Sequence, residues 1–130
     1  MASVLGEQLD REMAVKQPGQ IAVIEFPQTD LAQGKRRPVL LLAQPPGPHD
    51  DWWVCMFSTQ LDHALPNFDE VVRPGDSDFA ASGLRRESVI RVARVAVVAA
   101  PQLIGSLGAI APERLTRIRH RLVDWLNAVA

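Results

Sequence analysis

The chain has 130 residues, of which 47% are hydrophobic and 22% are charged, and its formal net charge is −1. This length supplies one hydrophobic core, and the composition excludes a chain that is disordered throughout. The small net charge excludes an overall electrostatic attraction to nucleic acid or to an anionic membrane. The charges are unevenly placed, since residues 1–80 are acidic overall, residues 81–130 are basic, and 12 of the 14 cations are Arg.

The cysteine content and the apolar runs indicate the cellular setting. The single cysteine, Cys55, excludes an intrachain disulfide and a Cys-rich metal site. Its apolar neighbours predict a buried hydrophobic side chain rather than a nucleophile. The longest apolar run, 95–100, is far shorter than the roughly 20 residues of a membrane-spanning helix, and the N-terminus has no signal-peptide pattern. We therefore expect a cytoplasmic protein with no membrane association.

Five to seven short strands are predicted along the chain, with one or two of them in residues 88–99, and they are separated by turns that are rich in Pro, Gly and polar residues. A polar N-terminal arm or short helix is expected over 1–18, followed by one domain over 19–130. The predicted strands are 20–26, 38–43, 52–57, 68–73, 88–99 and 103–109. The second is apolar throughout, which is typical of a strand buried on both faces. The fifth is expected to bend near Arg94.

The C-terminal segment has the pattern of one amphipathic helix that begins at Pro112. Its apolar side chains recur at steps of three and four residues, at Leu115, Ile118, Leu122, Leu126 and Val129. Its other side carries Arg114, Arg117, Arg119 and Arg121, which we interpret as a solvated charged face. The predicted fold is therefore mainly β: a small, curled, mostly antiparallel sheet with a C-terminal α-helix packed on it.

Several common kinds of site have no support in the sequence. Strands and helices do not alternate, and no glycine-rich phosphate-binding motif occurs, so a parallel nucleotide-binding sheet is excluded. His49, His63 and His120 each lack a second ligand at metal spacing, so we expect no metal and no cofactor.

Two other places favour anion binding. Residues 34–38 (Gly-Lys-Arg-Arg-Pro) set three cations at the mouth of a buried strand, where Lys35 and Arg37 should point one way and Arg36 the other. Residues 57–60 (Phe-Ser-Thr-Gln) end another apolar strand in two hydroxyls and an amide. Taken singly, each is also typical of an ordinary solvated loop or of a strand end that satisfies backbone groups.

Taken in order along the chain, these and three further segments resemble the MazF/PemK family of bacterial toxins, which are sequence-selective endoribonucleases paired with an antitoxin. The further segments are 19–26, 88–91 (Ser-Val-Ile-Arg), and 104–107 with 111–115. The resemblance covers about residues 19–126. It implies a PemK-type, SH3-like barrel-like sheet, a two-fold homodimer and a cognate antitoxin whose acidic, disordered tail covers the cationic site.

The resemblance also implies the chemistry. RNA would be cut by its own 2′-hydroxyl, without a metal, and Arg37 and Arg91 would neutralise the charge on the phosphate while Ser58 holds it by a hydrogen bond. Because the pKa of arginine exceeds about 12, another group must take the proton, and Asp30 is the candidate, with Glu25 second.

Four neighbouring residues complete the predicted site, and two expected acids are missing from it. Lys35, Arg36, Thr59 and Gln60 are expected to bind the substrate. Residues 31–33 (Leu-Ala-Gln) lack the acid that the family usually has before its Arg-Pro pair, and Ala93 stands where its PemK branch has a second. Trp52, Trp53 and Phe57 are available to stack on bases, but we expect them in the core.

Two alternative functions remain at this point. Toxins of the same fold also inhibit DNA gyrase by binding it, which needs a contact surface and no Arg–hydroxyl site. The missing acids are also compatible with a family member that has lost catalysis and serves as a binding module.

Overall fold

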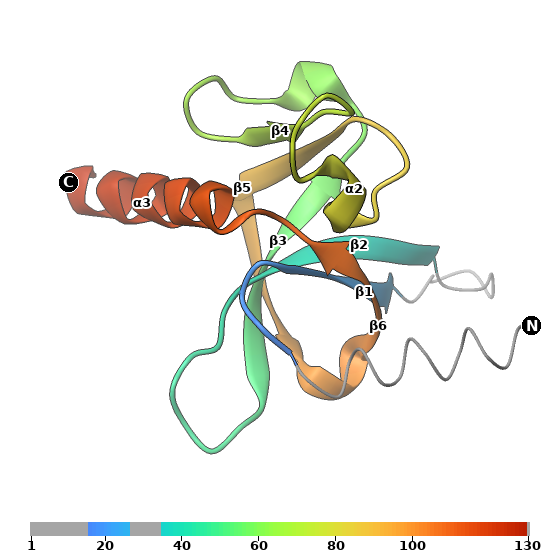
Figure 1. Ribbon diagram of the computed structural model, residues 1–130. Helices are drawn as coiled ribbons and strands as arrows, with labels where there is room; N and C mark the ends of the chain where they lie inside the picture. The colour runs from blue at the N-terminus through green and yellow to red at the C-terminus, as the bar shows by residue number, and fades with distance from the viewer. Residues whose placement is uncertain (1–15, 27–34, 130) are drawn as a thin grey trace, which may run out of the picture.

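The structure is a computed structural model that describes residues 16–26 and 35–129. Its strands form one sheet in the order β4-β5-β3-β2-β1-β6, in which every neighbouring pair is antiparallel (Figure 1). The strands are β1 (Gln20–Phe26), β2 (Lys35–Ala43), β3 (Asp51–Ser58), β4 (Glu70–Val72), β5 (Ser88–Ala99) and β6 (Leu103–Ala109). The helical segments are η1 (Leu61–His63), α2 (Phe79–Ser82), η2 (Ala100–Gln102) and α3 (Pro112–Ala128). The predicted sheet with a C-terminal helix is confirmed.

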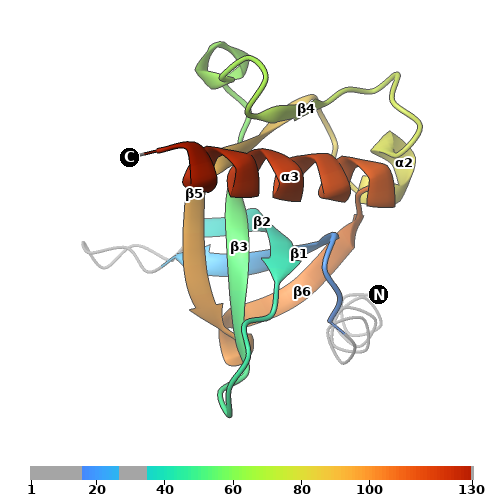
Figure 2. The ribbon, with the colours of Figure 1, turned by 90° about the vertical axis from the view of Figure 1, so that its left-hand side faces the viewer.

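The sheet has a hydrophobic core on each face. In β2, Val39 and Leu41 belong to one core while Leu40 and Leu42 belong to the other, so the prediction of a strand buried on both faces is confirmed. The first core joins side chains of β1, β2, β3, the end of β5 and the start of β6. The second lies beneath α3, which crosses β5 and β3 and buries Ile118 completely (Figure 2).

A close contact joins α2 to β6 at one side of the curled sheet. α2 follows the edge strand β4, and β6 is the other edge strand. A Cβ atom at Gly83 would lie 2.1 Å from the Leu107 carbonyl oxygen, and a Cβ atom at Gly108 would lie 2.0 Å from that of Ala81. Both glycines also have positive φ, +73° and +159°. Only glycine therefore fits at these two positions.

The second strand begins at Lys35 rather than at the predicted Pro38. Lys35 to Pro38 pair with β1 alone, because the ladder between β2 and β3 reaches only as far as the Val39–Met56 pair. Pro38 therefore lies on a free edge, where its missing N–H removes no hydrogen bond from the β2–β3 ladder. The sheet is open at this point, since β3 continues beside β5 and no longer beside β2.

The bend predicted near Arg94 is confirmed as a bulge in β5. Cys55 pairs with Val95, yet the next residue of β3, Met56, pairs with Arg91, so the three residues between them on β5 are extra. The N–H of Val92, which lies inside the bulge, donates instead to Asp69 Oδ1 at 2.8 Å. The bulge thereby brings residues on both of its sides to the open part of the sheet.

The predicted strand 68–73 is shorter in the structure, and two predicted loops contain helical turns. The N–H groups of Phe68 and Asp69 both donate to the Leu65 carbonyl, so these residues form a turn and β4 begins at Glu70. η1 and α2 lie within segments that the sequence predicted as irregular. None of the helices in the described part of the chain is both long and apolar enough to span a membrane.

The interpretation of the α3 arginines as a solvated face is wrong for Arg114, which is buried, and for Arg121, which is half-buried, whereas Arg117 and Arg119 are exposed as predicted. Arg114 is only 7% exposed, and its guanidinium donates to Asp78 at 2.8 and 2.9 Å, to Asp76 at 3.0 Å and to Glu70 at 3.0 Å. Arg117 and Arg121 also donate to Glu70. Arg119 donates to the Leu42 carbonyl at 2.9 Å. The sequence hides this network because its carboxylates lie 36 or more residues before the arginines they bind.

These ion pairs change the acidity of the groups involved. The hydrogen bond from Arg114 is the main reason why the pKa of Asp78 lies below its ordinary value. Burial by itself raises the pKa of Glu70, but the hydrogen bond from Arg117 and the charges of the three arginines outweigh it, so this pKa is also lowered. The hydrogen bond from Arg114 to Asp78 in turn raises the pKa of the Arg114 guanidinium.

Candidate functional site

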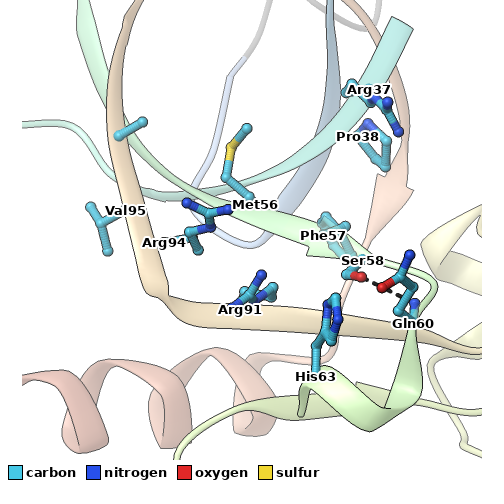
Figure 3. A pocket seen from close by; sticks show the side chains of 11 residues that line it. Arg37, Pro38, Met56, Phe57, Ser58, Gln60, His63, Arg91, Arg94 and Val95 are labelled. Atoms are coloured by element: carbon cyan, nitrogen blue, oxygen red, sulfur yellow. Dashed lines mark hydrogen bonds between the residues drawn. The ribbon is translucent and has the colours of Figure 1, made fainter. Parts of the chain in front are cut away.

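A cleft of about 530 Å³ opens where β2 and β3 part (Figure 3). One wall comes from the start of β2, the floor from the end of β3, and the rest from the turn with η1 and from the bulge of β5. The residues that line it are Arg37, Pro38, Met56, Phe57, Ser58, Gln60, His63, Arg91, Arg94, Val95 and Ala96.

The cleft brings together four of the predicted site residues, namely Arg37, Ser58, Gln60 and Arg91. Lys35, Arg36 and Thr59 are exposed and are not among the residues that line it. Arg36 lies instead on the outer side of the β1–β2 pair, with its Nε 3.9 Å from Glu25 Oε2. Asp30, the predicted general base, lies outside the described residues.

Three guanidinium groups face the cleft without an anionic partner. Within residues 16–26 and 35–129, Arg37, Arg91 and Arg94 make no ion pair, and no Asp or Glu is among the residues that line the cleft. The Nε atom of Arg91 is buried and has no hydrogen-bond partner among the described residues. Because a buried N–H without an acceptor is costly and a concave cationic surface concentrates anions, the cleft suits an anionic ligand.

A hydroxyl and an apolar floor accompany these cations. The Oγ atom of Ser58 accepts a hydrogen bond from the Gln60 N–H at 3.0 Å, which fixes the turn after β3 and leaves the hydroxyl hydrogen free to be donated. Met56 and Phe57 supply apolar surface beside it. An anion carrying a flat or apolar group therefore finds complementary contacts here.

Sequence reasoning missed two residues of the cleft, Arg94 and His63. Arg94 follows Arg91 at a spacing of three across the predicted bend, and that repeat was a usable signal once the bend was predicted. His63 follows the Ser-Thr-Gln motif within a few residues, but nothing in the sequence shows that the intervening turn folds back beside β5.

Ala93 is exposed and lines a different groove from Arg91 and Arg94. This apolar groove, of about 430 Å³, lies between α3, the bulge of β5 and the segment before β4. Its other lining residues are Leu65, Phe68, Val92, Val95, Leu122 and Trp125. Ala93 is not among the residues that line the cationic cleft, whereas Val95 lines both cavities.

The burial of the tryptophans and of Cys55 was also predicted from the sequence. Trp52 is 3% exposed, as expected, but its neighbour Trp53 is 45% exposed, so the prediction that Trp53 is a core residue is wrong. Cys55 is buried, which confirms the prediction, and burial raises the pKa of its thiol to about 12. In the described part of the chain, no group of three or more His, Cys, Asp or Glu residues is placed to hold a metal ion.

Comparison with known proteins gives a family match and structural neighbours. Residues 17–126 match the model of the "PemK-like, MazF-like toxin of type II toxin-antitoxin system" family. A crystal structure of a MazE–MazF complex from Deinococcus radiodurans is similar, with a TM-score of 0.65 and 21% identity over 88% of this chain and 98% of that one. No match was found among curated protein sequences.

Two mycobacterial structures are also similar. The Mycobacterium tuberculosis toxin MazF-mt6 has a TM-score of 0.61 and 16% identity, over 85% of this chain and 99% of that one. An endoribonuclease in complex with its cognate antitoxin, from a mycobacterial species, has a TM-score of 0.60 and 15% identity, over 89% and 99% of the two chains. At these identities the neighbours establish a shared fold.

Proposed function

Because the chain belongs to the PemK-like, MazF-like toxin family of type II toxin–antitoxin systems, we propose that it is a toxin that cuts single-stranded RNA without a metal ion. One observation carries this proposal: three guanidinium groups that have no anionic partner among the described residues share a cleft with the Ser58 hydroxyl. A phosphodiester supplies negative charge, which none of the described residues that line the cleft provides.

The proposed reaction is attack by the RNA 2′-oxygen on the adjacent phosphorus. The bond from phosphorus to the 2′-oxygen forms, the bond to the 5′-oxygen breaks, and a cyclic phosphate remains. Negative charge builds on the non-bridging oxygens, and Arg37 on β2 and the two β5 arginines reach it from opposite walls. Donors held ready in this way are commonly worth about 3 kcal/mol each. Ser58 donates its hydroxyl hydrogen to one of the same oxygens.

The remaining cleft residues suit the binding of bases rather than phosphate. Proteins read single-stranded RNA by stacking bases on flat side chains and by hydrogen bonds to the base edges. Phe57 provides a ring in the floor, and the Gln60 amide provides a donor and an acceptor at the rim. Lys35, Arg36 and Thr59, which are exposed and do not line the cleft, are proposed to contact the RNA backbone beyond the scissile phosphate.

The partner proteins follow from the same surfaces. The cognate antitoxin is proposed to lay an acidic, disordered tail over the cleft arginines, since the α3 arginines already have partners within the chain. The face of Trp53 and Val97, which are register partners on β3 and β5 and are 45% and 60% exposed, is proposed to join two copies in a cytoplasmic homodimer. A monomeric mass measured by light scattering at micromolar protein concentration would contradict the proposed dimer.

The test is cleavage of a mixed-sequence RNA in EDTA by the parent chain and by the Arg37→Ala variant. We expect fragments that end in a cyclic phosphate, and a loss of cleavage in the variant. Arg85→Ala is the matched control, because Arg85 is exposed and does not line the cleft. Intact RNA together with inhibition of DNA gyrase would favour the alternative toxin mechanism. Intact RNA without gyrase inhibition would favour the non-catalytic binding module.

A further inference from the structure

Among the residues that the structure describes, His63 is the one histidine that lines the cleft. The titratable residues that line it are three arginines and His63. A guanidinium keeps its proton, because the pKa of arginine exceeds about 12, whereas imidazole is the side chain that gains and loses a proton in the physiological range. Among the described residues that line the cleft, His63 is therefore the one suited to acid–base chemistry.

Local hydrogen bonds fix the backbone of His63 relative to Ser58. The backbone N–H of His63 donates to the Gln60 carbonyl at 3.0 Å, and the backbone N–H of Gln60 donates to Ser58 Oγ, also at 3.0 Å. The Ala64 N–H donates to the Leu61 carbonyl at 3.1 Å, which closes the single turn of η1. Figure 3 shows the imidazole rising from η1 toward the end of the cleft where Ser58 lies.

The His63 side chain is accessible from solvent. His63 is exposed, and its side chain makes no hydrogen bond or ion pair within residues 16–26 and 35–129. The charged groups around it are Arg91 and Arg94 of β5, Arg37 of β2, and its exposed neighbour Asp62 on η1. The arginines hold the phosphate, and this leaves proton transfer as the task that they cannot perform.

We propose that His63 is the general base of the RNA cleavage reaction, an inference that rests on the ribonuclease function proposed above. As the 2′-oxygen bonds to phosphorus, its proton passes to an imidazole nitrogen of His63. The bond from phosphorus to the 5′-oxygen breaks, and the departing oxygen takes a proton from solvent water. This assignment gives His63 the role that the sequence suggested for Asp30 or Glu25. Glu25 itself does not line the cleft.

The experiment measures single-turnover RNA cleavage in EDTA between pH 5 and pH 9, under conditions that saturate the enzyme with RNA. For the parent chain, the rate should rise with pH over the range in which imidazole loses its proton. His63→Gln, which keeps a polar side chain, should cut about 100-fold or more slowly at neutral pH and should lose this rise. It should bind an uncleavable 2′-O-methyl RNA as tightly as the parent does.

His120→Gln is the matched control, since His120 is exposed on α3 and does not line the cleft. It should retain the parent rate and pH profile. If His63→Gln also retains both, the inference is wrong although the ribonuclease function stands. If the parent chain cuts no RNA, both proposals fail together.

A second substrate separates a base from an acid. Once the cut sequence is mapped, an RNA with sulfur in place of the departing 5′-oxygen supplies a leaving group that needs no protonation. His63→Gln should remain as defective on this substrate as on ordinary RNA, because a missing base still limits the reaction. Full recovery of the variant on the sulfur substrate would show that His63 acts as an acid and would overturn the assignment.

Discussion

Two groups of arginines in this molecule have opposite surroundings. On α3, Arg114, Arg117 and Arg121 share the carboxylates of Glu70, Asp76 and Asp78, and the most buried arginine has the most partners. Around the cleft, Arg37, Arg91 and Arg94 have no anionic partner among the described residues.

The two groups of arginines therefore contribute differently. The first group fixes the position of α3 against the turn and strand that precede β5, because its charges are satisfied within the chain. The second group keeps its charge available for a ligand. The sequence shows two similar sets of arginines, and only the location of the carboxylates distinguishes a structural set from a binding set.

The largest expected effect on stability belongs to Arg114. Arg114→Met keeps the apolar stem but leaves the buried carboxylate of Asp78 without its main partner, and it removes one of the three arginines that bind the buried Glu70. Removing one member of a buried ion pair typically costs 3–5 kcal/mol, so we expect a loss of about 4 kcal/mol in the free energy of unfolding. Urea denaturation measures it. A loss no greater than that of the control Arg85→Met would erase the distinction between the two groups of arginines.

Acid should weaken the same network. The pKa values of Glu70, Asp76 and Asp78 are lowered in the folded state, so the stability they contribute is fully present above the ordinary values of about 4.5 and 3.8. It is lost as the pH falls through the lowered values. Denaturation midpoints measured from pH 7 down to pH 3 should therefore fall, and the fall should be smaller in Arg114→Met. An equal fall in both proteins would place the acid sensitivity elsewhere.

Ser58→Ala tests the hydroxyl of the cleft. A hydrogen bond to a charged group is worth about 1.5–3 kcal/mol, which corresponds to about a 10- to 100-fold loss of cleavage rate. Thr116→Ala is the control, because Thr116 is an exposed hydroxyl residue on α3 that does not line the cleft. The role of the Ser58 hydroxyl is refuted if Ser58→Ala cuts RNA as fast as Thr116→Ala.

The smallest expected effect is on the salt dependence of RNA binding, which should differ between the two groups of arginines. For single-stranded nucleic acid, each cation that neutralises a phosphate adds about 0.7 to the slope of log affinity against log salt concentration. Arg94→Ala should reduce that slope by about 0.7 with a 2′-O-methyl RNA. Arg117→Ala should leave it unchanged, because Arg117 already binds Glu70. Equal changes in the two variants would contradict the comparison.

Local patterns predicted the parts of the fold that depend on neighbouring residues. The apolar run before Gln44, the bend near Arg94 and the helix that begins at Pro112 all appear where expected. Pairing across the chain was not predictable, since the partners of Arg114 come from a distant turn. The burial of Trp53 was predicted wrongly for a similar reason, because α3 covers only part of the sheet face on which Trp53 lies.

The cleft was predicted in part. The resemblance placed Arg37, Ser58, Gln60 and Arg91 in one site, and the structure brings these four residues together. His63 and Arg94 reach the same cleft through a turn of η1 and through the three-residue bulge of β5. Both features depend on how β3 pairs with β5, a contact between segments that are far apart in the sequence.

The most direct test of the account is a paired measurement on Arg91→Met. This variant keeps the aliphatic stem of Arg91 and removes the guanidinium, whose buried Nε atom has no partner in the described part of the chain. We expect single-turnover RNA cleavage in EDTA to fall about 100- to 1,000-fold. We expect the free energy of unfolding to change by no more than about 0.5 kcal/mol. Cleavage at the parent rate, or a loss of stability as large as that of Arg114→Met, would contradict the claim that the cleft arginines serve RNA rather than the fold.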